Sequence, residues 1–182
     1  MTARLTMADT GHAVLRQQQG VVWLGRTVGA WQVRAIAGGQ WSGAFDSGGK
    51  HFHLNPGWAA GVSAGRNILA QHGAWPYVSG SGALAVASMS GPGDQRLTAA
   101  DLRIGFDAGW LFADRFDVHA VGRLFGGPVF WRRAGTTDTG TDRWHVQLGA
   151  GLGVRLAAGL SVFAEAVPLG ETGASAGVAA RW

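Results

Sequence analysis

Apolar and polar residues alternate along this chain over long stretches. In the segment 143–156 every even position is apolar, whereas the odd positions hold Arg, His, Gln and Gly. The same alternation recurs along 31–42 and 102–112. Successive side chains of a strand point to opposite faces, so a period of two predicts β-strands. We predict eight strands, near 30–42, 57–68, 75–90, 98–111, 117–131, 143–156, 160–168 and 174–182.

The connections between these segments alternate in length. Short spacers alternate with longer polar ones, and the long loops are expected at 43–57, 91–98 and 133–142. Alternating short and long connections are typical of a meander whose long loops lie at one end. The pattern therefore predicts an all-β fold, namely an antiparallel up-and-down transmembrane β-barrel of eight strands, with ten as the alternative.

The N-terminal segment has a less regular pattern. We assign the barrel to residues 29–182 and leave 1–28 as a segment of unclear structure, either a further strand around 20–25 or a periplasmic lead-in. Bacterial single-chain barrels have even strand numbers, so a ninth strand would imply a tenth. The first residues of the given chain contain no apolar run of the kind found in signal peptides.

Composition indicates which face of the strands meets solvent. Charged residues make up 14% of the chain, against roughly 25% in soluble proteins. The polar face carries mainly Gly, Ser, Gln and His, which is a poor water-facing surface. We therefore expect the apolar face to contact lipid and the polar face to line the lumen. The alternative is a soluble lipocalin-like carrier with its apolar face inside.

Tryptophan residues lie mostly near the predicted strand ends, where membrane-interface aromatics are expected. They are Trp31, Trp41, Trp58, Trp75, Trp110, Trp131, Trp144 and Trp182.

The predicted inward face carries charges that must be paired when they are buried. The expected lumen charge network consists of Arg34, Arg103, Asp107, Arg123, Arg155 and Glu165. Eight strands leave an interior just wide enough for side chains, so we predict a filled lumen. The alternative, an anion-permeable pore, would need ten or more strands.

Histidines and cysteines limit the chemistry that the chain offers. His51 and His53 share a face and are weak metal candidates without an evident third ligand, while His119 and His145 are expected to form interior hydrogen bonds. There is no Cys. We predict no cofactor, no metal and no catalytic residue, and the dispersed basic residues favour no nucleic-acid partner.

The C-terminal sequence SAGVAARW resembles the terminal assembly signal of bacterial outer-membrane barrels through Ser175, Gly177, Ala180 and Trp182. The predicted strand layout over residues 30–182 is similar to the small barrels of the OmpA and OmpX type. The resemblance implies recognition by the barrel-assembly machinery, residence among the lipids of a Gram-negative outer membrane, and a structural, adhesive or interaction role. The long loops would then meet an extracellular partner that the sequence does not identify. Two further alternatives are a fragment of a translocator barrel and a lipid A-modifying outer-membrane enzyme.

Overall fold

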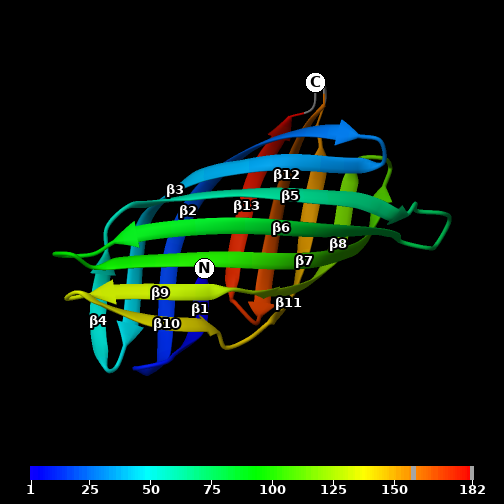
Figure 1. Cartoon of the computed structure of the whole chain (residues 1–182). Coiled ribbons are helices and arrows are strands. Elements are labelled where there is room, and N and C mark those ends of the chain that lie inside the picture. The colour runs from blue at the N-terminus through cyan, green and yellow to red at the C-terminus, as the bar shows by residue number, and fades with distance from the viewer. Residues whose placement is uncertain (157–158, 181–182) are drawn as a thin grey trace.

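The computed structural model of this chain describes residues 1–156 and 159–180 and consists of strands joined by turns (Figure 1). The thirteen strands of the described residues belong to one sheet. They are β1 (Thr2–Met7), β2 (Gly11–Val28), β3 (Trp31–Ser47), β4 (Lys50–Leu54), β5 (Gly57–Leu69), β6 (Tyr77–Ser90), β7 (Arg96–Phe112), β8 (Phe116–Gly126), β9 (Pro128–Arg133), β10 (Thr136–Asp142), β11 (Val146–Arg155), β12 (Leu160–Leu169) and β13 (Gly173–Ala180). In the described ranges, no helix is long and apolar enough to cross a membrane.

The sheet is an antiparallel meander, which confirms the predicted all-β, up-and-down class. The prediction of eight strands is wrong in number. β8 and β9 run one after the other along the single strand β7 and are separated at Gly127. The predicted strand 117–131 is therefore divided in two, and β10, which pairs with β9, lies within the predicted loop 133–142. Each of the eight predicted segments nevertheless coincides with strand in the structure.

The N-terminal segment belongs to the same sheet. β2 pairs with β3 from Ala13↔Ser47 to Val28↔Trp31. β1 pairs with β2 on one side and with β10 on the other. Most of residues 1–28 therefore lie in strands of this sheet.

The two ends of the sheet differ. The connections 29–30, 70–76 and 113–115 form what we call the turn end. The opposite end carries the β1–β2, β3–β4 and β9–β10 hairpins, and we call it the hairpin end. The predicted long loops lie at the hairpin end, but most of their residues are strand. β3 continues to Ser47, β4 covers 50–54, β7 begins at Arg96, and β9 and β10 turn at 134–135.

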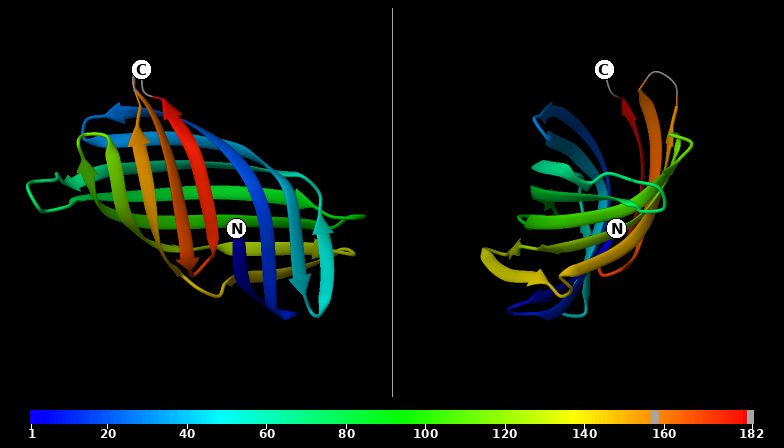
Figure 2. Two further views of the ribbon diagram at one scale, coloured as in Figure 1. Left: turned by 180° about the vertical axis from the view of Figure 1, so that it is seen from behind. Right: turned by 90° about the vertical axis from the view of Figure 1, so that its right-hand side faces the viewer.

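The pairings close on themselves at the hairpin end. β1, β2, β3, β5, β6, β7, β9 and β10 form a circuit, because β9 pairs with both β7 and β10 and because β10 pairs with β1. Toward the turn end, β8, β11, β12 and β13 extend the sheet from β7. There β13 and β2 lie apart, as the right view of Figure 2 shows. No pairing between them occurs among the described residues.

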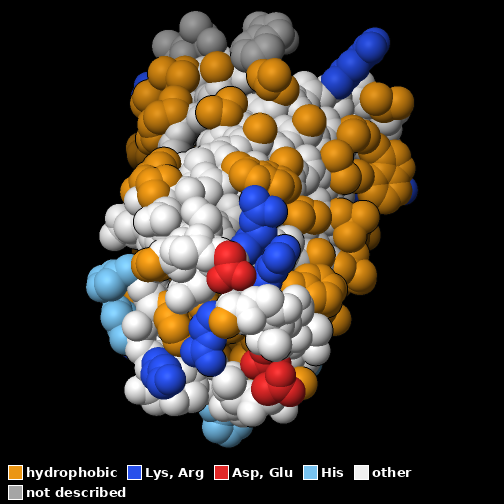
Figure 3. Space-filling view, turned by 60° about the vertical axis from the view of Figure 1, so that its left-hand side comes forward, with side chains coloured by type: hydrophobic (Ala, Val, Ile, Leu, Met, Phe, Trp, Pro, Cys, Tyr) orange, Lys and Arg blue, Asp and Glu red, His pale blue; other side chains and the backbone are white. Residues whose placement is uncertain are grey.

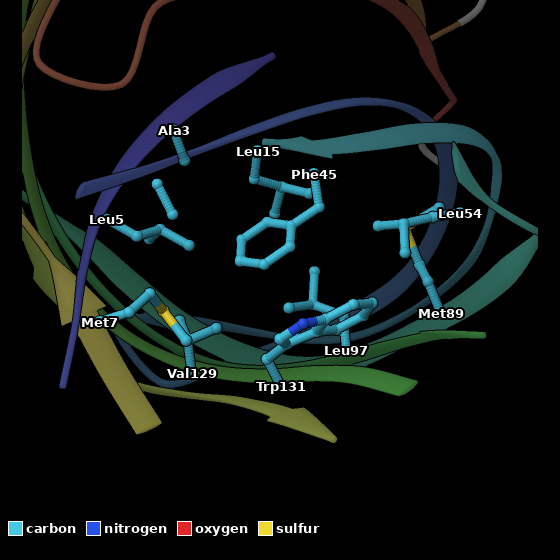
Figure 4. Close-up of a cluster of buried hydrophobic side chains, with 11 residues drawn as sticks. Ala3, Leu5, Met7, Leu15, Phe45, Leu54, Met89, Leu97, Val129 and Trp131 are labelled. Carbon is cyan, nitrogen blue, oxygen red and sulfur yellow. The ribbon is translucent and has the colours of Figure 1, made fainter. Parts of the chain in front are cut away.

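The closed circuit holds an apolar core (Figure 4). Phe45, Phe52 and Trp131 pack there with tilted rings, whose centroids are 5.0 Å apart for Phe45–Trp131 and 5.4 Å apart for Phe52–Trp131. Trp131 is buried, so its predicted place on the outer surface is wrong. The reason is that in β9 the odd positions face inward. The buried members of this core are Ala3, Leu5, Met7, Ala13, Leu15, Phe45, Leu54, Met89, Leu97, Val129 and Trp131.

Candidate functional site

The most informative feature of the structure is a reversal of polarity along the strands, which β7 illustrates. Odd positions of β7 face inward throughout, starting with buried Leu97 at the hairpin end and continuing to Arg103 and Asp107 toward the turn end. Even positions face outward, starting with Arg96 and continuing to exposed Leu102 and the residues that follow it. The hairpin end is therefore apolar inside and polar outside, whereas the rest of the sheet is polar inside and apolar outside.

The outward apolar positions form a belt. On β7 they run from Leu102 to Phe112, and on β3 from Trp31 to Trp41. Each span corresponds to the about 9 to 11 residues with which a tilted strand crosses a bilayer. Figure 3 shows hydrophobic side chains covering most of the upper surface, while His and most charged side chains gather lower down. The belt covers only part of each long strand, and the remainder reaches the hairpin end.

Six of the predicted interface tryptophans are exposed on this surface, between 40% and 76%. They fall at two levels of the belt. Three lie toward the turn end, namely Trp31, Trp75 and Trp110, and three lie toward the hairpin end, namely Trp41, Trp58 and Trp144. The predicted Trp182 lies outside the described residues.

A β-bulge at Trp41 helps to produce the reversal on β3. Gln18 pairs with Ser42 and Gln19 pairs with Gln40, so Trp41 is the extra residue. A bulge changes which residues face each side of a strand. Before it the even position Gln40 is buried, and after it the odd position Phe45 is buried. The bulge thus keeps Trp41 outward while both Gln40 and Phe45 face the interior.

The interior of the belt region holds a charge pair from the predicted network. Arg123 Nη1 and Nη2 donate to Glu165 Oε1 and Oε2 at 2.6 and 2.7 Å. The two residues come from β8 and β12, on either side of β11. Gly151 of β11 has no side chain, and His119 lies directly over it. Glycine on the inner face of β11 therefore leaves room for side chains from its neighbours.

A second charged group is centred on Arg103. Its Nη2 lies 2.7 Å from Asp101 Oδ2 and 3.2 Å from Glu171 Oε2. Gln147 Nε2 donates to Glu171 Oε2 at 2.8 Å. Arg103 therefore joins β7 to the turn between β12 and β13. The sequence pattern identified Arg103 but not Asp101, Gln147 or Glu171. Asp101 and Gln147 occupy the inward phase of their strands and could have been found from it, whereas Glu171 follows the last position of β12 and carries no periodic signal.

Two buried carboxyls near Arg103, those of Glu171 and Asp142, have raised pKa values. Burial raises the pKa of Glu171 to about 7, although Arg103 acts to lower it, and the carboxyls of Asp142 and Asp101 raise it further. Burial likewise raises the pKa of Asp142 to about 6, assisted by Asp101. Both carboxyls therefore retain protons at a higher pH than they would in water.

The other predicted network members lie apart from these two groups. Arg34 Nη2 donates to Gln32 Oε1 at 2.8 Å, and the Arg34 guanidinium lies 4.8 Å from the Trp23 ring centroid. Asp107 accepts a long hydrogen bond of 3.4 Å from Ser79 Oγ. Arg155 is exposed at the end of β11. The predicted single network is thus divided into separate groups.

The histidines follow the sequence expectations in part. His145 Nδ1 lies 3.2 Å from the Phe125 carbonyl oxygen, and His119 Nδ1 lies 3.5 Å from Asp117 Oδ2. The exposed His51 contacts Asp46, and this hydrogen bond lowers the pKa of Asp46. His53 packs edge-on against His51. Within the described part of the chain, no group of three or more His, Asp or Glu residues could hold a metal ion.

A cavity of about 320 Å³ lies where the apolar core meets the polar interior. Leu5 and Leu15 line it from one side, and Gln40, Asp101 and Glu171 also face it. The amide oxygen of buried Gln40 has no hydrogen-bond partner among the described residues. The cavity therefore combines apolar walls with hydrogen-bond acceptors.

Three of the residues in the predicted assembly signal, Ser175, Gly177 and Ala180, lie on β13, while Trp182 is beyond the described range. Ser175 pairs with Glu165 and Gly177 pairs with Phe163. Comparison of the chain with models of protein families, with curated proteins and with solved structures finds no match.

Proposed function

We propose that this chain is an integral β-barrel protein of a Gram-negative outer membrane, with a filled lumen and a structural, adhesive or interaction role. The observation that carries the proposal is the reversal of polarity along the strands. An outward apolar belt with a polar interior suits lipid. An outward polar surface with an apolar core suits water, and the hairpin end has this arrangement.

The belt supports lipid as the surrounding medium. Soluble monomers rarely expose contiguous apolar patches above about 300–600 Å². Here large hydrophobic side chains remain exposed on most of the long strands, including Leu84, Ile104 and Leu152. A soluble carrier would place these side chains inside. Their outward orientation therefore favours the membrane protein over the lipocalin-like alternative.

The interior supports a filled lumen rather than a pore. The packed rings of Phe45, Phe52 and Trp131 occupy the closed circuit at the hairpin end. The Arg123–Glu165 pair projects into the interior over β11, nearer the turn end. A conducting path would have to pass both groups. We therefore expect little or no ion conductance.

The hairpin end supports the interaction role. Its strands extend beyond the belt as hairpins whose outward residues are largely polar, such as Thr137, Thr139 and His51. Outer-membrane barrels have short periplasmic turns and longer extracellular connections. We accordingly assign the turn end to the periplasm and the hairpin end to the cell exterior. The extracellular partner would meet the β3–β4 and β9–β10 hairpins.

The proposal is tested by expressing the chain behind a signal peptide, fractionating the membranes and comparing the mobility of boiled and unboiled protein in SDS. We expect a compact, heat-modifiable band in the outer-membrane fraction. Planar-bilayer recording of the same protein should show no stable channels. Soluble protein without a mobility shift would refute the membrane assignment, and steady single-channel currents would refute the filled lumen.

A further inference from the structure

Two strand edges face the same gap near the turn end. Pairing with β1 covers β2 only as far as Arg16, and Met1 adds backbone bonds to Gln17. From Gln18 to Val28, β2 pairs only with β3 among the described residues. β13 likewise pairs only with β12. Both edges therefore present backbone N–H and C=O groups that are able to bind a further strand.

β1 enters this gap from the hairpin end and is bonded to both sides of it. The Met1 nitrogen donates to the Gln17 carbonyl at 2.9 Å. On the other side, Thr2 and Thr172 exchange two backbone hydrogen bonds of 2.7 and 3.0 Å. Thr172 directly precedes β13. In the left view of Figure 2 the N-terminus lies between β13 (red) and β2 (blue). The direction of β1, followed backward from Met1, therefore leads between β2 and β13.

The registers of the two edges agree. The β1–β2 register and the Thr2–Thr172 bridge both extend in phase toward the turn end. Val22 and Val178 then lie opposite the same position, the fifth residue upstream of Met1. Both valines are strongly exposed, at 70% and 64%. One residue nearer Met1, Val21 and Gly177 share a position on the opposite face. A single strand would thus match the inward and outward phases of both edges.

The number of strands that fit is also defined. β2 and β13 run in the same direction, because an even number of antiparallel pairings separates them along the sheet. An antiparallel filling of the gap therefore needs an odd number of strands. Because β1 reaches both sides at Met1 and Thr2, that number is one.

We propose that the gap between β2 and β13 is the seat of one further strand, joined to Met1 on its N-terminal side and antiparallel to both edges. Apolar residues would occupy the positions that lie an odd number of residues upstream of Met1, and they would face outward with Val22. Small residues would occupy even distances, because the Phe163 ring covers Gly177 on the inner face. This inference rests on the proposed function in one respect, namely that hydrocarbon offers no water to satisfy unpaired edges.

The test adds an eight-residue extension upstream of Met1 with alternating Leu and Gly or Ser. The described residues contain no cysteine, and neither does the rest of the sequence. A Cys at the fifth upstream position can therefore be combined with Val22→Cys or, separately, Val178→Cys. We expect a disulfide with each partner. Val62→Cys is the matched control, since Val62 is 55% exposed but lies on β5. Hydrogen exchange of the amides in 19–25 and 174–180 that point into the gap should slow by at least tenfold relative to the unextended chain.

An extension of equal length with Pro at the fourth position upstream of Met1 should leave hydrogen exchange unchanged, because Pro cannot donate a backbone hydrogen bond to a neighbouring strand. Unchanged exchange and no disulfide with the alternating extension would overturn the inference. Disulfide-linked dimers of unextended Val22→Cys protein would also overturn it, because a second copy would then occupy the gap. Flotation of the unextended chain with phospholipid vesicles tests the proposed function separately, so either idea can fail while the other stands.

Discussion

Arg123 on β8 and Glu165 on β12 are joined by two hydrogen bonds of 2.6 and 2.7 Å across the intervening strand β11. Both side chains are mostly shielded from solvent, at 23% and 16% exposure. Two parallel N–H···O bonds fix the geometry of such a pair. Strands separated by a third strand are thereby connected through the interior.

Glu165→Gln should lower the free energy of unfolding by about 1–3 kcal/mol, because it leaves the Arg123 guanidinium without its charged partner. Urea titration of protein folded in vesicles measures this change. The double variant with Arg123→Gln should recover part of the loss. Strictly additive effects of the two single substitutions would contradict a direct interaction.

The buried carboxyl of Glu171 gives stability a pH dependence of defined sign. Its pKa is raised from 4.5 to about 7, because burial outweighs the effect of Arg103. The folded state therefore binds more protons than the unfolded state between these values. Stability should fall as pH rises from about 4.5 to 7, by on the order of 2 kcal/mol, and then level off.

Glu171→Gln should remove most of that slope, which denaturant titrations at pH 5 and pH 8 would show. Asp142, whose pKa is raised to about 6, adds a smaller contribution of the same sign. A Glu171→Gln variant with an unchanged slope would contradict this assignment.

The belt should be intolerant of charge. Phe106 is 53% exposed on the outward face of β7, near the middle of the belt span from Leu102 to Phe112, so Phe106→Lys should reduce the stability of the membrane-inserted state by about 2–4 kcal/mol. Thr139→Lys, on the outward face of β10 at the hairpin end, is the matched control and should change stability by less than about 0.5 kcal/mol. Refolding into vesicles followed by protease protection compares the two. Equal effects would contradict the belt.

The apolar core at the hairpin end should depend on Phe45, which is fully buried. Phe45→Ala removes the ring that contacts Trp131 and should cost about 3–5 kcal/mol. Phe130→Ala, one residue from Trp131 but 41% exposed, should cost much less. Chemical denaturation followed by tryptophan fluorescence reports on both variants. A similar loss for the two would show that the rings do not form a common core.

The alternation of residues along 98–111 or 143–156 was sufficient to predict strands, because a period of two is a local property of a strand. The lengths of the connections predicted the antiparallel meander, and the low charge content predicted the inward placement of Arg103, Arg123 and Glu165. The alternation did not separate strand from loop at the hairpin end. There the outward positions are Thr, His and Arg, and the inward apolar residues such as Leu54 and Leu97 are spaced among turn formers.

The sequence by itself determined the strand class and the two faces of each strand. Only the tertiary structure decided that one strand changes its surroundings along its length. The tertiary structure brings Phe45 to Trp131, and Arg103 to Glu171, through pairings between distant segments. Such contacts depend on register and on bulges such as the one at Trp41. A one-residue slip would exchange every inward residue for an outward one, so local alternation alone cannot define the interior.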